Sequence, residues 1–322
     1  MDYQKRQNSR QSGNKILPFR FSRAWLFKQT IKHLIADERG YHRYFLTDPH
    51  LLYLSDQQSG TYLDVMQTPQ YTNRFHSSTV EIINDNLERL CRGEGDTRTF
   101  IDLGPGYPDK TLPMVKYLRS QRIKTDYCPI DINKSFLNLA EKAMSPFVNS
   151  TSPINSNFLT AAEKVPTELR KQYVHCILGL TFMNFAPQVI IPQLKALCGS
   201  NGSILLAAEV LNDPMELEGM LEVYRRETAR NVAFGPLANL GFNQEQVNYK
   251  VSFKGARIEM AFTVKHCTMD QTEKTGLKSG DEVVTAISYR YTPNQLREIL
   301  KTHFKDFEII FSEDLSTAIA IC

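Results

Sequence analysis

The stretch Phe100-Ile101-Asp102-Leu103-Gly104-Pro105-Gly106 decides the fold. It predicts a buried strand that runs into a glycine turn, and residues 110–120 behind it have the spacing of a helix. Glycine has no Cβ, so its backbone can approach a ligand closely. The acid Asp131 ends the next predicted strand, where a carboxylate can accept hydrogen bonds from both hydroxyls of a ribose. This arrangement predicts a nucleoside site.

Strand-like and helical segments alternate outward from this stretch, which is typical of a parallel sheet with helical crossovers. The expected strands are 99–103, 126–130, 173–180 and 203–210, and the expected helices are 110–120, 134–143 and 190–198. Two of these strands, 173–180 and 203–210, are too apolar for a sheet edge and are expected at its centre. The alternation resumes with 283–291 and 293–303, and the closing pair 307–311 and 317–322 predicts a hairpin.

The pattern changes in two regions. Between Trp25 and Tyr71, short amphipathic pieces separated by Pro and Gly breaks predict a cap of helices, and residues 77–90 predict one long helix. After Val210 we expect a helix, an irregular stretch rich in Gly, Pro and Asn, and two strands, at 215–230, 234–243, 246–253 and 257–265 respectively. This second group predicts an inserted lobe.

The expected fold class is therefore α/β: a doubly wound, Rossmann-like sheet with a C-terminal β-hairpin, plus a second α+β lobe that binds the substrate. The boundaries we expect are a disordered basic arm at 1–15, the substrate lobe at 16–75 and 212–286, and the sheet domain at 76–211 and 287–322.

Composition excludes several classes of protein. The 322 residues are 42% hydrophobic with a net charge of +3, as in an ordinary globular chain. Residues 1–35 carry eight Lys and Arg and one acid, which we interpret as a solvated arm, so no nucleic-acid partner is expected. No stretch is long and apolar enough to span a membrane and the N-terminus lacks a secretory signal, which predicts a cytoplasmic protein without membrane partners. We expect a monomer or weak dimer.

Cysteine and histidine spacing gives no sign of a metal site. The six cysteines include no CxxC pair, and the seven histidines have no paired ligand spacing. We therefore expect no metal, and we expect most cysteines to be small core residues.

The glycine turn itself favours one cofactor over another. A dinucleotide fingerprint needs a third glycine, and Asp109 stands at that position, where a pyrophosphate would be repelled. S-adenosylmethionine has no pyrophosphate and suits a turn of two glycines with charged neighbours. We therefore expect S-adenosylmethionine, and a nucleotide-dependent oxidoreductase stays open as an alternative.

The chain resembles the S-adenosylmethionine-dependent Nα-methyltransferases that trimethylate histidine to hercynine in ergothioneine biosynthesis, and their relatives that act on other amino acids. The resemblance runs from about Pro49 to the C-terminus. It rests on blocks in the same order, which are 100–110, Pro129-Ile130-Asp131, 179–184, Val223-Tyr224, 257–260 and 285–288. It implies methyl transfer to the α-amine of a free amino acid.

The resemblance also implies roles for residues around the cofactor. Lys110 corresponds to the group that reaches the methionine carboxylate, and Asp131 to the ribose ligand. Asn157 and Phe158 stand where the family places an acid and an aromatic ring around adenine, and Tyr71 stands near the methionine end. With Gly104 and Gly106 these residues form the expected cofactor site.

On the substrate side, Asn184 and Tyr224 match the pair that holds the amine and carboxylate of the amino acid, and Met260 and Ser288 match its wall. Two positions depart from the histidine enzymes, since Ala286 replaces a Glu that bonds imidazole and Ser55 replaces a Tyr. A larger, less polar pocket favours an aromatic or indole side chain. Histidine methylation and a non-catalytic S-adenosylmethionine-binding protein remain alternatives. Glu209, at a strand end, either touches the substrate or anchors the next loop.

Overall fold

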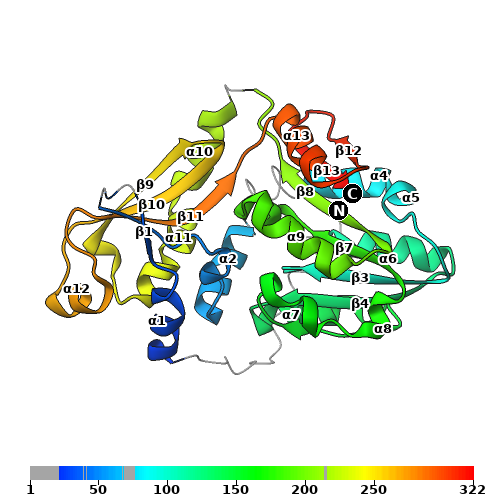
Figure 1. Ribbon diagram of the computed structural model, residues 1–322, viewed down its shortest axis with the longest axis horizontal. Helices are drawn as coiled ribbons and strands as arrows, with labels where there is room; N and C mark the ends of the chain where they lie inside the picture. Colours follow the sequence, from blue (N-terminus) through cyan, green and yellow to red (C-terminus); the bar gives the residue numbers. More distant parts are fainter. Residues whose placement is uncertain (1–21, 39, 41, 67, 69–76, 214–215) are drawn as a thin grey trace.

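The computed structural model describes residues 22–38, 40, 42–66, 68, 77–213 and 216–322. The expected basic arm at 1–15 and Tyr71 lie outside these ranges. The described chain forms two sheets side by side, the larger on the right and the smaller on the left of Figure 1.

The larger sheet has the strand order β12-β13-β8-β7-β3-β4-β5, and β6 also pairs with β4. Its strands are β3 (Thr97–Leu103), β4 (Lys124–Asp131), β5 (Ser150–Thr151), β6 (Ile154–Asn155), β7 (Tyr173–Leu178), β8 (Gly202–Glu209), β12 (Glu308–Phe311) and β13 (Thr317–Ile321). The pairs are parallel, except that β13 runs antiparallel to β8 and β12. The expectation of a doubly wound, Rossmann-like sheet that ends in a hairpin is confirmed.

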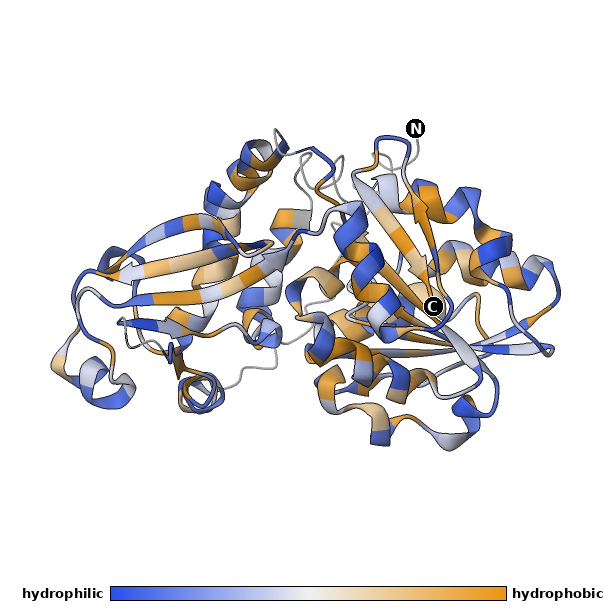
Figure 2. Cartoon of the chain, turned by 45° about the horizontal axis from the view of Figure 1, so that its top comes forward, coloured by the Kyte–Doolittle hydropathy of each residue, from blue (hydrophilic) through white to orange (hydrophobic). Residues whose placement is uncertain are grey.

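Helices cover both faces of this sheet, which explains why its central strands are apolar throughout. One face packs against α4 (Ser77–Asp85), α5 (Leu87–Leu90), α6 (Thr111–Ser120) and α7 (Lys134–Met144). The other packs against α8 (Thr167–Arg170), α9 (Pro187–Cys198) and α13 (Pro293–His303). Figure 2 shows the hydrophobic residues gathered on these strands and on the helix sides turned toward them. The chain leaves β3 toward β4 and later returns to β7 on its other side, so the point where strand order reverses lies at the carboxyl end of β3.

The smaller sheet has the order β1-β2-β11-β10-β9. Its strands are β1 (Ile35–Ala36), β2 (Arg43–Phe45), β9 (Val247–Lys254), β10 (Arg257–Val264) and β11 (Glu282–Tyr289). Around it lie α1 (Arg23–Ile31), the 3-10 helix η1 (Pro49–Leu52), α2 (Asp56–Met66), α10 (Glu216–Arg225), α11 (Glu227–Asn239) and α12 (Met269–Thr275). Leu237 of α11 and Phe262 of β10 share one buried core, so this sheet has a hydrophobic interior of its own.

Several expectations from the sequence are wrong. The strand near 283–291 does not resume the larger sheet but pairs with β10 and β2 in the smaller one. The N-terminal cap is not purely helical, because β1 and β2 extend the same small sheet. The helix expected over 77–90 breaks at Asn86, because its side-chain Nδ2 donates to the carbonyl of Ile82 while its backbone N–H donates to the carbonyl of Ile83.

The region expected to be irregular, 234–243, is helical as far as Asn239. Its Gly and Pro residues suggested loops, yet Gly235 serves helix packing: a Cβ there would lie 2.5 Å from Nε2 of Gln58 on α2. The single helix expected at 215–230 is divided into α10 and α11 at Arg226, which has an extended backbone.

Within the described ranges, no helix combines the length and apolar character needed to cross a bilayer.

Candidate active site

A cavity of about 440 Å³ is lined by both halves of the molecule. The larger sheet contributes the turn after β3, residues 179–181, 183 and 184, and Glu209 at the end of β8. The smaller sheet contributes Met260 of β10 and Ala286 to Ser288 of β11, while α10 and α11 supply a further wall. The carboxyl end of a parallel sheet, where strand order reverses, is the usual ligand site of such folds.

The glycine turn has the conformation that its sequence predicts. Gly104 and Gly106 have φ values of 61° and 51°, in the left-handed region that glycine adopts without strain. A Cβ on Gly104 would lie 3.6 Å from Oγ1 of Thr181 and 3.9 Å from the ring of Phe158. Both glycines line the cavity, and Phe158 lies beside the turn without being one of the wall residues.

Lys110 and Asp109 follow this turn on the cavity wall. Nζ of Lys110 is 3.5 Å from Oδ1 of Asp109, and the lysine stem passes Gly179. A contact of this length leaves an ammonium group with capacity for a carboxylate ligand. An acid next to the lysine also disfavours a pyrophosphate, in line with the choice of cofactor.

Asp102 is a cavity residue that the sequence reasoning left without a role. It is the last residue but one of β3, and its Oδ2 accepts from Oγ1 of Thr111 at 2.6 Å and from the hydroxyl of Tyr127 at 3.0 Å. Burial raises the pKa of Asp102 to about 6 despite these two donors. The signal in the sequence was an acid between the apolar residues Ile101 and Leu103, directly before the turn.

Asp131 ends β4 next to the turn. The backbone N–H of Gly104 donates to the carbonyl of Ile130 at 2.9 Å, so the two strand ends are adjacent. Oδ1 of Asp131 accepts from the backbone N–H of Asn133 at 2.8 Å. The residue is 6% exposed, and burial raises the pKa of its carboxyl to about 7. Asp131 is thus beside the cavity rather than on its wall.

Asn157 is also beside the cavity, and its amide is engaged by the protein. Oδ1 accepts from the backbone N–H of Leu159 at 2.9 Å, which turns Nδ2 toward Nε2 of His50 at 3.2 Å. An amide nitrogen only donates, so Nε2 accepts and a neutral His50 carries its proton on Nδ1. That Nδ1 lies 2.5 Å from Asp48.

Folding brings His33, Asp48 and His50 together, although they have no ligand spacing in sequence. Nδ1 of His33 is 3.2 Å from Oδ2 of Asp48, and the three groups are close enough to share a metal ion. The hydrogen bond from Asn157 assigns a proton to Nδ1 of His50, and a protonated nitrogen cannot be a ligand. In this arrangement His33, Asp48 and His50 hold the side chain of Asn157 in position rather than bind a metal ion.

Asn184 and Tyr224 line the same cavity although they come from different units. Asn184 ends the 3-10 helix η5 (Leu180–Asn184) behind β7, and its amide has no hydrogen-bond partner among the described residues. Tyr224 lies on α10, and Tyr249 anchors it by donating to its backbone carbonyl at 2.7 Å. A partly exposed amide and a phenol that face one space suit a polar ligand.

The remaining substrate residues fall into two groups. Met260, Ala286 and Ser288 line the cavity, whereas Ser55 does not. Oγ of Ser55 accepts from the backbone N–H of Gln58 at 3.2 Å and so caps the start of α2. Tyr53, two residues earlier, is on the wall instead and packs edge-on against Tyr62 at 5.1 Å.

Arg290 is the second cavity residue that the sequence reasoning missed. Its guanidinium forms an ion pair with Glu209, and the two side chains are 2% and 3% exposed. It also donates to the hydroxyls of Tyr224 and Ser288, at 2.5 and 2.7 Å. A lone Arg just beyond a strand gave no signal, because its partner Glu209 lies about 80 residues away in sequence.

Similarity to solved structures is low in sequence. The pyocyanin biosynthetic protein PhzM is 11% identical over 81% of this chain and 60% of its own, with a TM-score of 0.42. The citrinin polyketide synthase CMeT domain structure is 12% identical over 85% and 58%, with a TM-score of 0.46. The plantazolicin methyltransferase BpumL, bound to S-adenosylhomocysteine, is 11% identical over 84% and 92%, with a TM-score of 0.41. The chain thus spans about 60% of the first two proteins.

Comparison with curated protein sequences gives no match. A family model does match, and it covers residues 47–316, which is most of the chain and includes every described residue of the cavity wall. The chain therefore belongs to the family of histidine-specific, S-adenosylmethionine-dependent methyltransferases.

Proposed function

We propose that the enzyme methylates the α-amine of a free amino acid whose side chain is bulkier and less polar than that of histidine. One observation carries the proposal: Asn184, Tyr224 and Ser288 share a single cavity with the turn at Gly104 and Gly106. In this proposal, residues 16–75 and 212–286 form the substrate lobe.

The residues around the turn fit S-adenosylmethionine, which supplies an electrophilic methyl group when bound. Glycines without a Cβ leave room at the turn, Lys110 offers a cation to the methionine carboxylate, and buried Asp131 offers an acceptor to the ribose. Asp102, a second buried acid on the wall, offers an acceptor to the methionine amine. Phe158 beside Gly104 provides an apolar surface for adenine.

Methyl transfer to an amine depends mainly on geometry and on a deprotonated nitrogen. If the cavity held the amine nitrogen and the methyl group of bound S-adenosylmethionine in a reactive orientation, this positioning would supply roughly 7–11 kcal/mol of the barrier. Oδ1 of Asn184 can accept from the amine without carrying a charge that would stabilise the ammonium form. No general base is assigned, and in this proposal the proton leaves to water before the amine is enclosed.

The proposed side-chain preference rests on the apolar residues that the smaller sheet and residues 52–53 contribute to the wall. Met260 and Ala286 are buried there, and Leu52 and Tyr53 add apolar surface. Ala286 has no polar atom for an imidazole, whereas a hydrophobic wall stabilises an indole or phenyl ring by roughly 25 cal/mol per Å² buried. Histidine is the second candidate, because the family model is histidine-specific.

The test uses the purified full chain, S-adenosylmethionine labelled in the methyl group, and a panel of amino acids with indole derivatives. Mass spectrometry identifies which compounds gain labelled methyl groups. Preferential labelling of aromatic or indole compounds supports the proposal, and labelling of histidine alone supports the second candidate. Binding of S-adenosylhomocysteine without turnover of any compound would overturn both and favour a non-catalytic protein.

A further inference from the structure

The pair Glu209–Arg290 connects the two units at the cavity. Glu209 ends β8 of the larger sheet, Arg290 follows β11 of the smaller one, and an adjacent bridge joins Val210 to Tyr291. Burial by itself lowers the pKa of Arg290, but Glu209 and Tyr224 raise it above its usual value. The guanidinium is therefore a permanent charge at a fixed place on the cavity wall.

A guanidinium can only donate hydrogen bonds, so it dictates the direction of every bond it makes to a hydroxyl. One Arg290 nitrogen donates to the hydroxyl of Tyr224 at 2.5 Å, and another donates to Oγ of Ser288 at 2.7 Å. Both oxygens are thereby acceptors toward the protein. Their own protons have to find acceptors elsewhere.

The contacts among the described residues leave these two protons available. Oγ of Ser288 accepts a second time, from Tyr224 at 3.3 Å, and its own proton has no acceptor among the described residues. That 3.3 Å contact is long for a bond between two oxygens, which are normally 2.5–3.0 Å apart, so a better acceptor would draw the Tyr224 proton away. Both side chains line the cavity.

We infer that Arg290 is a positioning residue that makes Tyr224 and Ser288 a pair of hydrogen-bond donors for the carboxylate of the amino acid. The inference rests on the proposed function and adds a residue to it: Arg290 orients the two donors that meet the carboxylate of the free amino acid. Two donors side by side match the two oxygens of a carboxylate, whereas an amine lacking that group leaves them unpaired.

Glu209 completes the arrangement through its charge. An uncompensated guanidinium in the cavity would repel the cationic sulfonium of the methyl donor. Glu209 neutralises that charge and holds the Arg290 fork in one orientation. The hydroxyl groups of Tyr224 and Ser288 therefore line the cavity, while Arg290, which orients them, stays ion-paired with Glu209.

The test compares the wild type with Arg290→Lys, which keeps the charge but has one nitrogen in place of a planar fork. Calorimetry with S-adenosylhomocysteine present measures the binding of four probes: L-tryptophan, tryptamine, L-histidine and histamine. The wild type should bind at least one amino acid more tightly than the amine made by its decarboxylation. In Arg290→Lys this preference should fall about tenfold, through weaker amino-acid binding. KM for the amino acid should rise more than kcat falls.

The matched control is Arg257→Lys, an arginine of the smaller sheet that is ion-paired with the buried Glu259 and is not on the cavity wall. It should leave the preference unchanged. If Arg290→Lys fails to fold, the double variant Glu209→Gln/Arg290→Met removes both buried charges together and should lose the same preference. Retained affinity for S-adenosylhomocysteine reports an intact fold in each variant.

Two results separate the inference from the proposed function. A wild type that binds tryptamine or histamine as tightly as the amino acid, or an Arg290→Lys variant with an unchanged preference, overturns the carboxylate inference and leaves amine methylation standing. A wild type that binds none of the four probes, yet binds S-adenosylhomocysteine, overturns both.

Discussion

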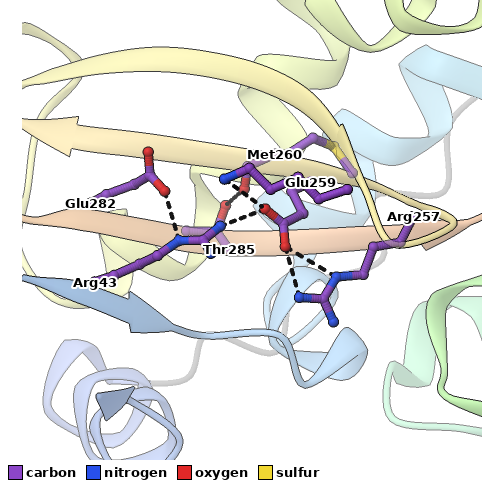
Figure 3. Close-up of polar contacts among 7 residues, drawn as sticks. Arg43, Arg257, Glu259, Met260, Glu282 and Thr285 are labelled. Atoms are coloured by element: carbon purple, nitrogen blue, oxygen red, sulfur yellow. Dashed lines mark hydrogen bonds and ion pairs between the residues drawn. The ribbon is translucent and has the colours of Figure 1, made fainter. Parts of the chain in front are cut away.

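Two buried carboxylates of this enzyme are each paired with arginine, and they differ in where the arginine bonds end. Glu259 of β10 is 1% exposed and receives Arg43 at 2.5 Å and Arg257 at 2.7 Å, while Arg43 also donates to Glu282 at 2.8 Å (Figure 3). These bonds end on carboxylates within one sheet. Arg290, besides its ion pair with Glu209 and a bond to the carbonyl of Tyr289, donates to two hydroxyls that line the cavity.

The difference shows that a buried ion pair does not by itself indicate a functional site. The Glu259 network joins β2, β10 and β11 through their side chains, which holds three strands together. The Glu209–Arg290 pair instead orients donors toward a space that a ligand can enter. The two networks differ in which groups accept the arginine hydrogen bonds, not in burial or in charge.

Glu259→Ala should give the largest effect on stability. It leaves Arg43 and Arg257 without their shared buried partner, and breaking a buried pair in this way typically costs about 3–5 kcal/mol. Denaturant unfolding should show this loss, while the affinity of the remaining folded protein for S-adenosylhomocysteine stays at the wild-type value. A stable variant, or one that loses cofactor affinity at equal folding, would contradict the purely structural role of this network.

Asn184→Ala should do the reverse. Its amide has no bond to the described protein, so its removal should change the free energy of unfolding little. Turnover should fall on the order of 100-fold if the amide orients the amine, because misplacement of the nitrogen raises the barrier directly. Single-turnover kinetics, with calorimetry of S-adenosylhomocysteine as the control, test this; an equal loss of cofactor affinity would place Asn184 in the cofactor site instead.

Ala286→Glu probes the side-chain end of the cavity. A carboxylate there would hydrogen-bond imidazole and would be costly next to an apolar ring, so the preference for histidine over tryptophan should rise by about tenfold or more. Competition between the two amino acids for labelled methyl groups measures that ratio. The matched control is Ser55→Glu, because Ser55 is off the cavity wall, and it should leave the ratio unchanged. Val283, on the same strand as Ala286, is in the core and is therefore unsuitable as a control position.

Much of this arrangement was predictable from local sequence. The strand and glycine turn at 100–106 were confirmed because their pattern depends only on neighbouring residues and on burial of both sheet faces. The position of β11 was not predictable, because an apolar strand near 283–291 fits either sheet and long-range pairing with β10 decides between them. Arg290 escaped notice for the same reason, since its partners come from β8, α10 and β11.

The smallest predicted effect is a pH dependence of cofactor binding, and it arises from a buried acid that has no arginine. Burial raises the pKa of Asp131 to about 7, so the free enzyme holds this carboxyl partly protonated near neutral pH. Ribose hydroxyls that donate to Asp131 would stabilise its ionised form and lower its pKa in the complex. Binding would then release a proton, and affinity for S-adenosylhomocysteine should be constant well above pH 7 and fall about five- to tenfold between pH 7.5 and 6.

The stability of the ligand-free protein should respond to the same group with the opposite sign. A carboxyl whose pKa rises from 3.8 to about 7 on folding favours the folded state most at acid pH, and this contribution is lost as the pH rises from about 4 to 7.

The variant Asp131→Asn tests the pH dependence of cofactor binding. It should reduce the slope of cofactor affinity against pH measured by calorimetry, leaving only the smaller contribution of Asp102, whose pKa is about 6. An unchanged slope in this variant would mean that Asp131 does not meet the ribose. Glu259 provides the contrast, because its two oxygens are already paired with Arg43 and Arg257 and it is not on the cavity wall, whereas the carboxylate of Asp131 is left for a ligand.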